Sequence, residues 1–243
     1  MRMPPDGIRL PKLNRLRTWQ DEEFRFAAWN MAIDEACLEI SLREGVSVVR
    51  FYHWDHAATT IGYFDPYPAT GSAISAKNEV VRRFTGGGRV DHGEDATFAL
   101  CLSPGLPASL AASGIRYRWI HEALAFSLSE AASGRVTLVP ATTPFREGPC
   151  FSAPVAWDLI DRLDGQKIAG GAQRRTRGAV LHQGSIRLPE LHRAPRSRWV
   201  QVFFEQLAET NAPLETEEIE ALLFQADRLV SERYGTFGWN QRV

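Results

Sequence analysis

Three consecutive glycines, Gly86 to Gly88, lie inside the segment RRFTGGGRVDHGED, which spans residues 82–95. Glycine adopts positive φ angles readily and has no β-carbon, so a run of glycines can present backbone amide groups directly to a ligand. The run does not have the spacing of the phosphate-binding patterns G-x-x-x-x-G-K-[ST] and G-x-G-x-x-G. It therefore predicts a site built on amide donors, with a glycine-rich hairpin turn as the alternative.

A second segment, GQKIAGGA, places Lys167 among small and apolar residues. The charge of a lysine in such surroundings is partly desolvated unless the side chain faces water or an anionic partner. An ammonium group of this kind can stabilise a carbonyl oxygen that gains negative charge during acyl transfer. The alternative is a lysine on an edge strand, where its charge discourages aggregation; on this segment alone, that alternative is favoured.

Composition excludes several classes of protein. The chain has 243 residues, which predicts one domain or one domain with an appendage. Hydrophobic residues make up 44% and charged residues 23%, as in folded globular proteins. The net charge is −1, from 28 basic and 29 acidic residues, so total charge gives no argument for binding nucleic acid or an anionic membrane.

The three cysteines, Cys37, Cys101 and Cys150, are widely spaced. An odd number at this spacing suits a reducing compartment and provides neither a disulfide framework nor a zinc-binding pattern. Cys37 and Cys101 are interpreted as small buried residues. The N-terminal segment lacks the apolar core of a signal peptide and no later stretch approaches a membrane span, so we expect a cytoplasmic protein.

Hydrophobic periodicity indicates the elements that position these residues. Helices are expected at residues 27–43, at 117–132 and in two apolar stripes of the C-terminal part, and strands at 47–54, 59–64, 79–84, 95–103, 136–139 and 178–188. Asp164-Gly165 predicts the tight turn of a hairpin that carries Lys167. The strands do not alternate regularly with helices, which predicts an α+β fold with a mixed or antiparallel β-sheet flanked by helices. The proline-containing stretch 188–198 is expected to be a surface connection.

Four segments resemble the biotin/lipoate protein ligase and octanoyltransferase family. RRFTGGGRVDH (82–92) is similar to the family motif RRxTGGGxVxH, and NMAIDEA (30–36) is similar to its N-terminal helix. RFYHWDHAATTIGYF (50–64) resembles its R-x-Y-x-W stretch that ends in I-G-x-F. GQKIAGGAQRRTRGAVLHQGSI (165–186) resembles its G-x-K-I-x-G-x-A-Q-R-R segment, which ends in L-H-x-G-S-I. Because the four segments occur in family order, the chain is identified as a member of this family.

The resemblance implies a single α+β catalytic domain over residues 1–243, similar to class II aminoacyl-tRNA synthetases and biotin synthetases. Its core would cover about residues 27–188 and its C-terminal helices about residues 198–235. The resemblance also implies that the glycine run and Arg83 line an acyl pocket, although an arginine on a strand is usually structural. It makes Lys167 a catalytic residue. The other positions that it implies in substrate binding are Gly86, Gly87, Gly88, His92, Gly170, Ala172 and His182, with His92 as pocket lining only.

Cys150 separates the two chemistries of the family. The segment GPCFSAPVAWDLI (148–160) resembles the C-F-x-x-P segment in which one group of octanoyltransferases carries its nucleophile. A thiolate is a strong nucleophile, and exchange of one thioester for another is nearly balanced in energy. In this hypothesis Cys150 takes an octanoyl group from acyl carrier protein and passes it to a lysine of a lipoyl domain or glycine-cleavage H protein. The reaction needs no cofactor or metal, and a small buried cysteine is the alternative.

An ATP-dependent lipoate-protein ligase is the alternative within the family. It would use ATP and Mg²⁺ to form a lipoyl-adenylate, with Lys167 holding the acyl carbonyl. Phe98 and Ala99 stand where many relatives have tyrosine-serine, and the stretch 103–124 is more similar to ligases, so the acyl donor is in doubt. Too few residues follow Leu188 for a full ligase accessory domain, which favours the transferase.

A non-catalytic relative that binds a fatty acyl or biotinyl group is the alternative from another class, and biotin ligation is a further one. Intact Lys167 and an intact glycine run favour catalysis, and Cys150 favours the lipoyl branch. The basic run Arg174, Arg175 and Arg177 is either a solvated strand face or a docking patch for an acidic acceptor domain. It is too short to indicate nucleic-acid binding.

Overall fold

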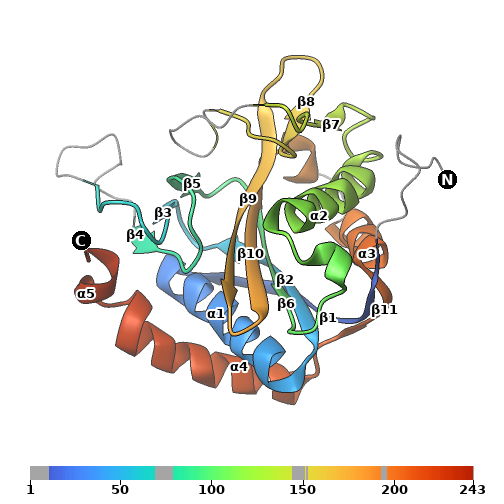
Figure 1. Cartoon of the computed structure of the whole chain (residues 1–243). Helices are drawn as coiled ribbons and strands as arrows, with labels where there is room; N and C mark the ends of the chain where they lie inside the picture. The colour runs from blue at the N-terminus through green and yellow to red at the C-terminus, as the bar shows by residue number, and fades with distance from the viewer. Residues whose placement is uncertain (1–10, 69–78, 144–150, 152, 193–195, 243) are drawn as a thin grey trace.

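The computed structural model describes residues 11–68, 79–143, 151, 153–192 and 196–242. Its larger β-sheet has eight strands in the order β11-β1-β2-β6-β10-β9-β8-β7 (Figure 1). The strand bounds are Leu13–Arg25 for β1, Ser47–Trp54 for β2, Ala96–Leu102 for β6, Val136–Leu138 for β7, Leu159–Asp161 for β8, Lys167–Thr176 for β9, Ala179–Ile186 for β10 and Ala208–Pro213 for β11. Strand β1 pairs in parallel with β2 and β11, and the other neighbouring pairs are antiparallel. The mixed sheet expected from the sequence is therefore confirmed.

A smaller sheet contains three strands in the order β4-β3-β5. The bounds are Ala58–Ile61 for β3, Glu79–Arg82 for β4 and Val90–His92 for β5. The glycine run lies in the connection from β4 to β5. The amide of Tyr63 donates to the carbonyl of Thr85 at 2.8 Å, so the start of this connection is attached to the turn that follows β3.

Helices cover both faces of the larger sheet, with α1 and α4 on one face and α2 and α3 on the other (Figure 1). The helices are α1 at Ala27–Glu44, α2 at Ser113–Leu128, α3 at Arg196–Leu207, α4 at Thr216–Leu229 and α5 at Phe237–Asn240, with short helical turns at Ala108–Leu110, Pro189–His192 and Val230–Tyr234. Helix α1 ends at Gly45, which has φ 66° and donates its amide to the carbonyl of Ser41. Glycine tolerates this left-handed conformation without strain.

Alternation along the central strands divides the core into two parts. On β6, the side chains of Phe98, Leu100 and Leu102 pack with α2 and α3. Ala99 and Cys101, which lie between them, pack with α1 and α4. Successive side chains of a strand point to opposite faces, so a strand covered on both sides can be apolar at successive positions, as β6 is from Phe98 to Leu102. This explains why these strands appear in the sequence as continuous apolar runs.

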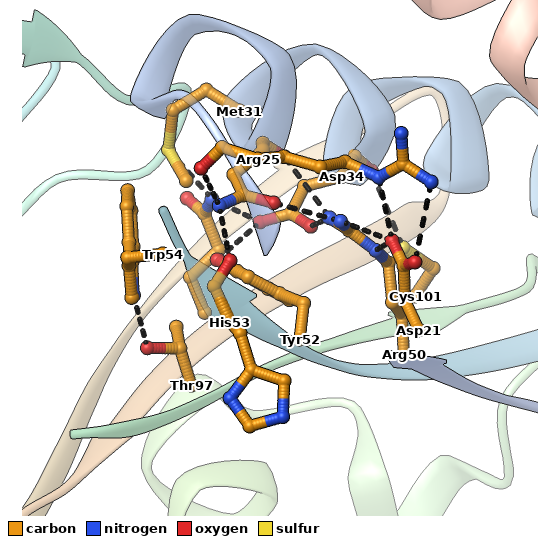
Figure 2. A network of polar contacts seen from close by, with 12 residues as sticks. Asp21, Arg25, Met31, Asp34, Arg50, Tyr52, His53, Trp54, Thr97 and Cys101 are labelled. Atoms are coloured by element: carbon orange, nitrogen blue, oxygen red, sulfur yellow. Dashed lines mark hydrogen bonds and ion pairs between the residues drawn. The ribbon is translucent and has the colours of Figure 1, made fainter. Parts of the chain in front are cut away.

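Arg50 of β2 is the centre of a buried polar network between the sheet and α1 (Figure 2). Its guanidinium donates to Asp21 of β1 at 2.7 Å and to Asp34 of α1 at 3.1 Å. It also donates to the side-chain oxygen of Asn30 at 2.7 Å and lies 4.2 Å from the centre of the Tyr52 ring. Arg50 and Asp34 are completely buried, so each charge depends on the other for compensation.

The two carboxyl groups of this network have pKa values shifted in opposite directions. Burial raises the pKa of Asp34 above its ordinary value, and the donors around it only partly oppose this effect. Burial also acts on Asp21, but the charges and hydrogen bonds of Arg50 and Arg25 outweigh it and lower the pKa. Asp21 therefore carries the carboxylate that is more firmly ionised.

The structure differs from the sequence-based expectation mainly at the two ends of the described chain. The expectation included neither β1 nor β11, and these strands pair from Leu13 with Ala208 to Thr18 with Pro213. Many charged residues interrupt the apolar pattern of β1, and the strand has a register shift between Gln20 and Phe24. The other expected elements are present, with ends that differ by a few residues, and the hairpin turns at Gly165 with φ 73°.

We predict that Arg50→Leu lowers the free energy of unfolding by about 3–5 kcal/mol, because it removes the cation that pairs with the completely buried Asp34 and leaves Asp21 with Arg25 alone. Urea denaturation followed by circular dichroism measures the change. Arg43→Ala is the control: Arg43 makes an exposed ion pair with Glu44 at 3.0 Å and should contribute less than about 1 kcal/mol. Equal effects of the two substitutions would contradict a central role for Arg50.

Candidate active site

Lys167 begins strand β9 and forms a buried ion pair with Asp158. Its Nζ lies 2.7 Å from Oδ2 of Asp158, and the two side chains are 3% and 0% exposed. The hydroxyl of Tyr117 donates to Oδ1 of Asp158 at 2.5 Å and accepts the amide of Gly171 at 2.9 Å. The desolvated lysine expected from the sequence is thus present, and an anionic partner compensates its charge.

The missing side chain of Gly170 makes room for Lys167. A β-carbon at Gly170 would lie 2.5 Å from Nζ of Lys167 and 3.0 Å from Oδ1 of Asp158. Real β-carbons do not approach other atoms this closely, so any other residue at this position would displace the ammonium group. The glycine-rich part of β9 therefore serves the lysine as well as the cavity beside it.

Two cavities meet beside Lys167 and Phe151. The wide cavity has a volume of about 1410 Å³ and is lined by Lys167, Phe151, His92 and Arg187, among others. The narrow cavity has a volume of about 40 Å³ and shares Phe151 and His92 with the wide one. Arg187 lies over the Phe151 ring at 3.8 Å, and Nζ of Lys167 lies 5.4 Å from the centre of the same ring. Phe151 thus stands at the boundary between the two cavities.

Small residues form one side of the narrow cavity. Strands β9 and β10 contribute Gly170, Gly171, Ala172 and Gly184 to it. The remaining lining residues are Met31, Tyr52, Thr60, Arg83, Gly87, Val90, His92, Thr97, Phe151, Gln183 and Ser185. The small residues on the side of β9 and β10 leave room for an unbranched apolar chain.

Arg83 holds the glycine run from inside. Its guanidinium donates to the carbonyl of Gly86 at 2.6 Å and to that of Gly88 at 2.8 Å. Gly87 has φ 83°, and a β-carbon at Gly62 would overlap the carbonyl oxygen of Gly87. The carbonyl groups of Gly86 and Gly88 thus face Arg83, whereas that of Gly87 lies against Gly62. Within the described residues, the amides of Gly86 to Gly88 donate no hydrogen bond.

Both ring nitrogens of His92 have partners. Nδ1 donates to Oδ2 of Asp95 at 2.7 Å, and Nε2 is hydrogen-bonded to Oγ1 of Thr60 at 2.9 Å. The ring stacks on Trp54 at 4.1 Å. Burial tends to raise the pKa of Asp95, but His92 and the hydroxyl of Ser185 outweigh it and hold this pKa far below its usual range. His92 thus forms a fixed wall between the cavities.

His182 lies in a buried aromatic group with Tyr117 and His121. Its ring centre is 5.6 Å from that of Tyr117 and 5.5 Å from that of His121. His121 donates from Nδ1 to the carbonyl of Trp157 at 2.7 Å. Burial lowers the pKa of His121 to about 4 and that of His182 well below its ordinary value. Both rings are therefore neutral near pH 7.

The structure brings most of the predicted site residues together. Arg83, Gly87, His92, Gly170 and Ala172 line the narrow cavity, Lys167 faces the wide one, Gly86 and Gly88 contact Arg83, and His182 lies in the aromatic group. Cys150 lies outside the described residues, and its neighbour in sequence, Phe151, stands where the cavities meet. The basic run is divided, because Arg174 stacks on Tyr63 whereas Arg177 pairs with Glu39.

Sequence reasoning missed Asp158, Tyr117 and Arg187. Tyr117 and Asp158 are 41 positions apart, so no local pattern connects them.

Among the described residues, no group of three or more histidine, cysteine or acidic side chains is arranged to hold a metal ion. In the same part of the chain, every helix is too short or too polar to cross a membrane.

Comparison with known proteins places these features in a family. Residues 27–189 match the lipoyl protein ligase A/B catalytic domain. The chain is 33% identical to octanoyltransferase LipM of Staphylococcus aureus over 172 residues, which are 65% of this chain and 60% of that protein. It is 32% identical to octanoyltransferase LipM of Bacillus subtilis over 190 residues, which are 70% and 66% of the two chains. The match thus spans just under two thirds of these relatives' length.

Solved structures share the fold. The bipartite lipoate protein ligase of Thermoplasma acidophilum superposes with a TM-score of 0.65 at 20% identity, over 94% of this chain and 96% of that one. Lipoate-protein ligase A bound with ATP superposes with a TM-score of 0.66 at 21% identity, over 94% and 98%. At this identity the likeness shows the fold alone, and it confirms the α+β arrangement expected from the sequence.

The neutral His121 predicts an acid-sensitive fold. Its pKa is about 4 in the folded chain and 6.5 ordinarily, so the unfolded chain binds a proton that the folded one excludes. Its contribution to stability is complete above pH 6.5 and is lost as the pH falls through about 4. We expect His121 to account for a loss of about 3 kcal/mol in the free energy of unfolding, measured by urea denaturation across this range.

His121→Asn is the matched variant, because asparagine can still donate to the carbonyl of Trp157 and does not titrate. Its free energy of unfolding should fall less between pH 6.5 and 4, with His182 accounting for part of the fall that remains. An unchanged pH dependence in this variant would show that another group causes the acid sensitivity.

Proposed function

The chain belongs to the lipoyl protein ligase A/B catalytic-domain family, and from this we propose that it is an octanoyltransferase that acts as one catalytic domain. It would move an octanoyl group from acyl carrier protein to a specific lysine of a lipoyl domain or of glycine-cleavage H protein. The relatives of this chain that are named octanoyltransferase LipM support the reaction class.

One structural observation carries the proposal. The ammonium group of Lys167 is buried beside Phe151, where the narrow cavity meets the wide one. The narrow cavity is lined on one side by the small residues of β9 and β10, which suits an acyl chain, and its volume of about 40 Å³ must increase to hold eight carbons. The wide cavity is large enough to admit the end of a protein-bound arm or a lysine side chain. A carbonyl carbon at the junction would lie next to the cation.

Cys150 would carry the acyl group between the two partners. Cys150 gives up its proton, its thiolate attacks the carbonyl carbon of the carrier thioester, the bond to the carrier sulfur breaks, and the carrier thiolate takes up that proton and leaves as a thiol. The neutral amine of the acceptor lysine then attacks the Cys150 thioester and forms the amide, and the proton released from nitrogen returns the cysteine to its thiol. Each step exchanges an already activated acyl group, so no ATP is needed.

Lys167 would stabilise the oxyanion in both steps. Each attack converts the carbonyl into a tetrahedral intermediate with negative charge on oxygen, and a fixed cation in a site sheltered from water stabilises that charge strongly. The amides of the glycine run donate no hydrogen bond within the described residues, so they are a second source of hydrogen-bond donors to this oxygen. Removal of one such donor typically lowers kcat by about 10²–10³-fold.

We predict that wild-type protein incubated with octanoyl acyl carrier protein gains one octanoyl group on Cys150, seen by mass spectrometry of the intact chain and its peptides. Addition of an apo lipoyl domain should discharge this group onto the acceptor lysine without ATP. Cys150→Ser should abolish transfer, and Lys167→Ala should slow it about 10²-fold or more.

Parallel reactions with octanoate, ATP and Mg²⁺ separate the transferase from a ligase. Acceptor modification that requires ATP and survives Cys150→Ser would overturn the thioester mechanism. Full activity of Lys167→Ala both with the carrier thioester and with octanoate, ATP and Mg²⁺ would show that Lys167 is not a catalytic residue.

A second prediction concerns Gly170. We expect Gly170→Ala to reduce transfer about 10²-fold, because the new methyl group displaces the ammonium of Lys167 and small misplacements of reacting groups are costly. Single-turnover rates measure the loss. Gly114→Ala on α2 is the control, since a β-carbon there meets no atom within 4 Å. Equal rates for the two variants would show that Lys167 does not need its observed position.

A further inference from the structure

The carboxylate of Asp158 is held by three donors. Nζ of Lys167 and the amide of Val155 each lie 2.7 Å from Oδ2, and the hydroxyl of Tyr117 lies 2.5 Å from Oδ1. The Asp158 side chain has no exposed surface. A buried carboxylate with donors on both oxygens has one orientation, so Asp158 is a fixed partner for the lysine.

Lys167 depends on this carboxylate for its charge. A buried ammonium without a counter-ion costs several kcal/mol, and such a group releases its proton or moves to water. Lys167 is 3% exposed, and its Nζ forms an ion pair with the buried carboxylate of Asp158. Asp158 therefore supplies a negative charge that stabilises the cation at the cavity junction.

Tyr117 connects this pair to the wall of the narrow cavity. Its hydroxyl donates to Asp158 and accepts the amide of Gly171, which lies four residues after Lys167 on the same strand. The contacts form a closed loop from the backbone of β9 through two side chains and back to the lysine. Any shift of Asp158 would break a hydrogen bond to the strand that carries the lysine.

The titratable groups around the pair leave its charge intact. On α2, His121 faces Asp158 with a pKa lowered to about 4, so the ring adds no competing cation near pH 7. On the side of the wide cavity, Arg187 is directed at the Phe151 ring and at the backbone carbonyl of Asp91. Within the described part of the chain, Asp158 and Lys167 thus balance each other.

We propose that Asp158 is a positioning residue that keeps Lys167 as an ammonium ion at the junction of the two cavities, and that Tyr117 fixes Asp158 in turn. This inference rests on the proposed transfer reaction, in which Lys167 contacts the reacting carbonyl. It assigns a role to an ion pair that could otherwise serve only to hold strands β8 and β9 together.

The test compares the rate of octanoyl transfer by Asp158→Asn with that of wild type at each pH from about 6 to 9. The Cys150 thiol and the acceptor amine titrate in the reactions of both wild type and variant. The ratio of the variant rate to the wild-type rate therefore reports on the charge of Lys167. Asparagine keeps the shape and removes the charge, so Lys167 loses its proton at lower pH. We expect the ratio to fall at least tenfold between about pH 6 and pH 9.

Three further variants separate positioning from folding. Asp158→Glu retains the charge and should give a ratio that does not change with pH, even if the rate falls. Tyr117→Phe should lower kcat with little change in KM for the carrier and with a flat ratio. Asp161→Asn is the matched control, because Asp161 lies on the same hairpin and pairs with Arg135 at 3.5 Å, and its ratio should not change with pH even if the rate falls.

A flat ratio for Asp158→Asn, with a melting temperature close to that of wild type, would overturn the proposal. If Asp158→Asn does not fold, Tyr117→Phe tests the proposal instead. An unchanged kcat of folded Tyr117→Phe would then overturn the proposal. Formation of octanoyl-Cys150 by wild type is measured first, so failure of the transferase mechanism is recognised separately. If wild type instead needs ATP, the same ratios are measured for the ATP-dependent reaction.

Discussion

The buried contact of Arg50 with Asp21 and Asp34 connects the layers of this protein. It joins β1, β2 and α1 at one point, and the second oxygen of Asp34 accepts the amide of Gln183 at 2.7 Å. Gln183 in turn accepts the hydroxyl of Thr85, directly before the glycine run, at 2.7 Å. Buried charges add little net stability, but incorrect pairing of them is costly, so the network fixes how α1 sits on the sheet and where the cavity wall lies.

The buried cations have different roles in this arrangement. Arg50 and Arg83 are buried and engaged with carboxylates or carbonyl groups of the chain, so they shape the site. Lys167 is the buried cation that faces a cavity at the point where an acyl carbonyl would lie. The two histidines behind it are neutral near pH 7, so they add no cation beside the ion pair of Lys167.

Sequence alone predicted the fold class and the desolvated surroundings of Lys167, because each depends on local patterns or motifs, whereas the catalytic role of Lys167 stays a prediction. It could not find Asp158 or Tyr117, since their contacts join segments far apart in the chain and neither residue lies in a recognisable motif. It missed β1 because charged residues on its exposed side hide the alternation. The roles of Cys150 and of the glycine amides remain predictions, and contacts such as that of Arg83 with Gly86 require coordinates.

The pairing of β1 with β11 also sets the order in which the protein can be completed during synthesis. Leu13 aligns with Ala208, and the guanidinium of Arg82 is bound by the carbonyls of Asn240 and Arg242. The edge of the larger sheet and the support of β4 thus depend on segments that leave the ribosome after the other strands of both sheets. A nascent chain must keep its N-terminal strand half-paired until then, which exposes a strand edge that is prone to aggregation and favours help from chaperones.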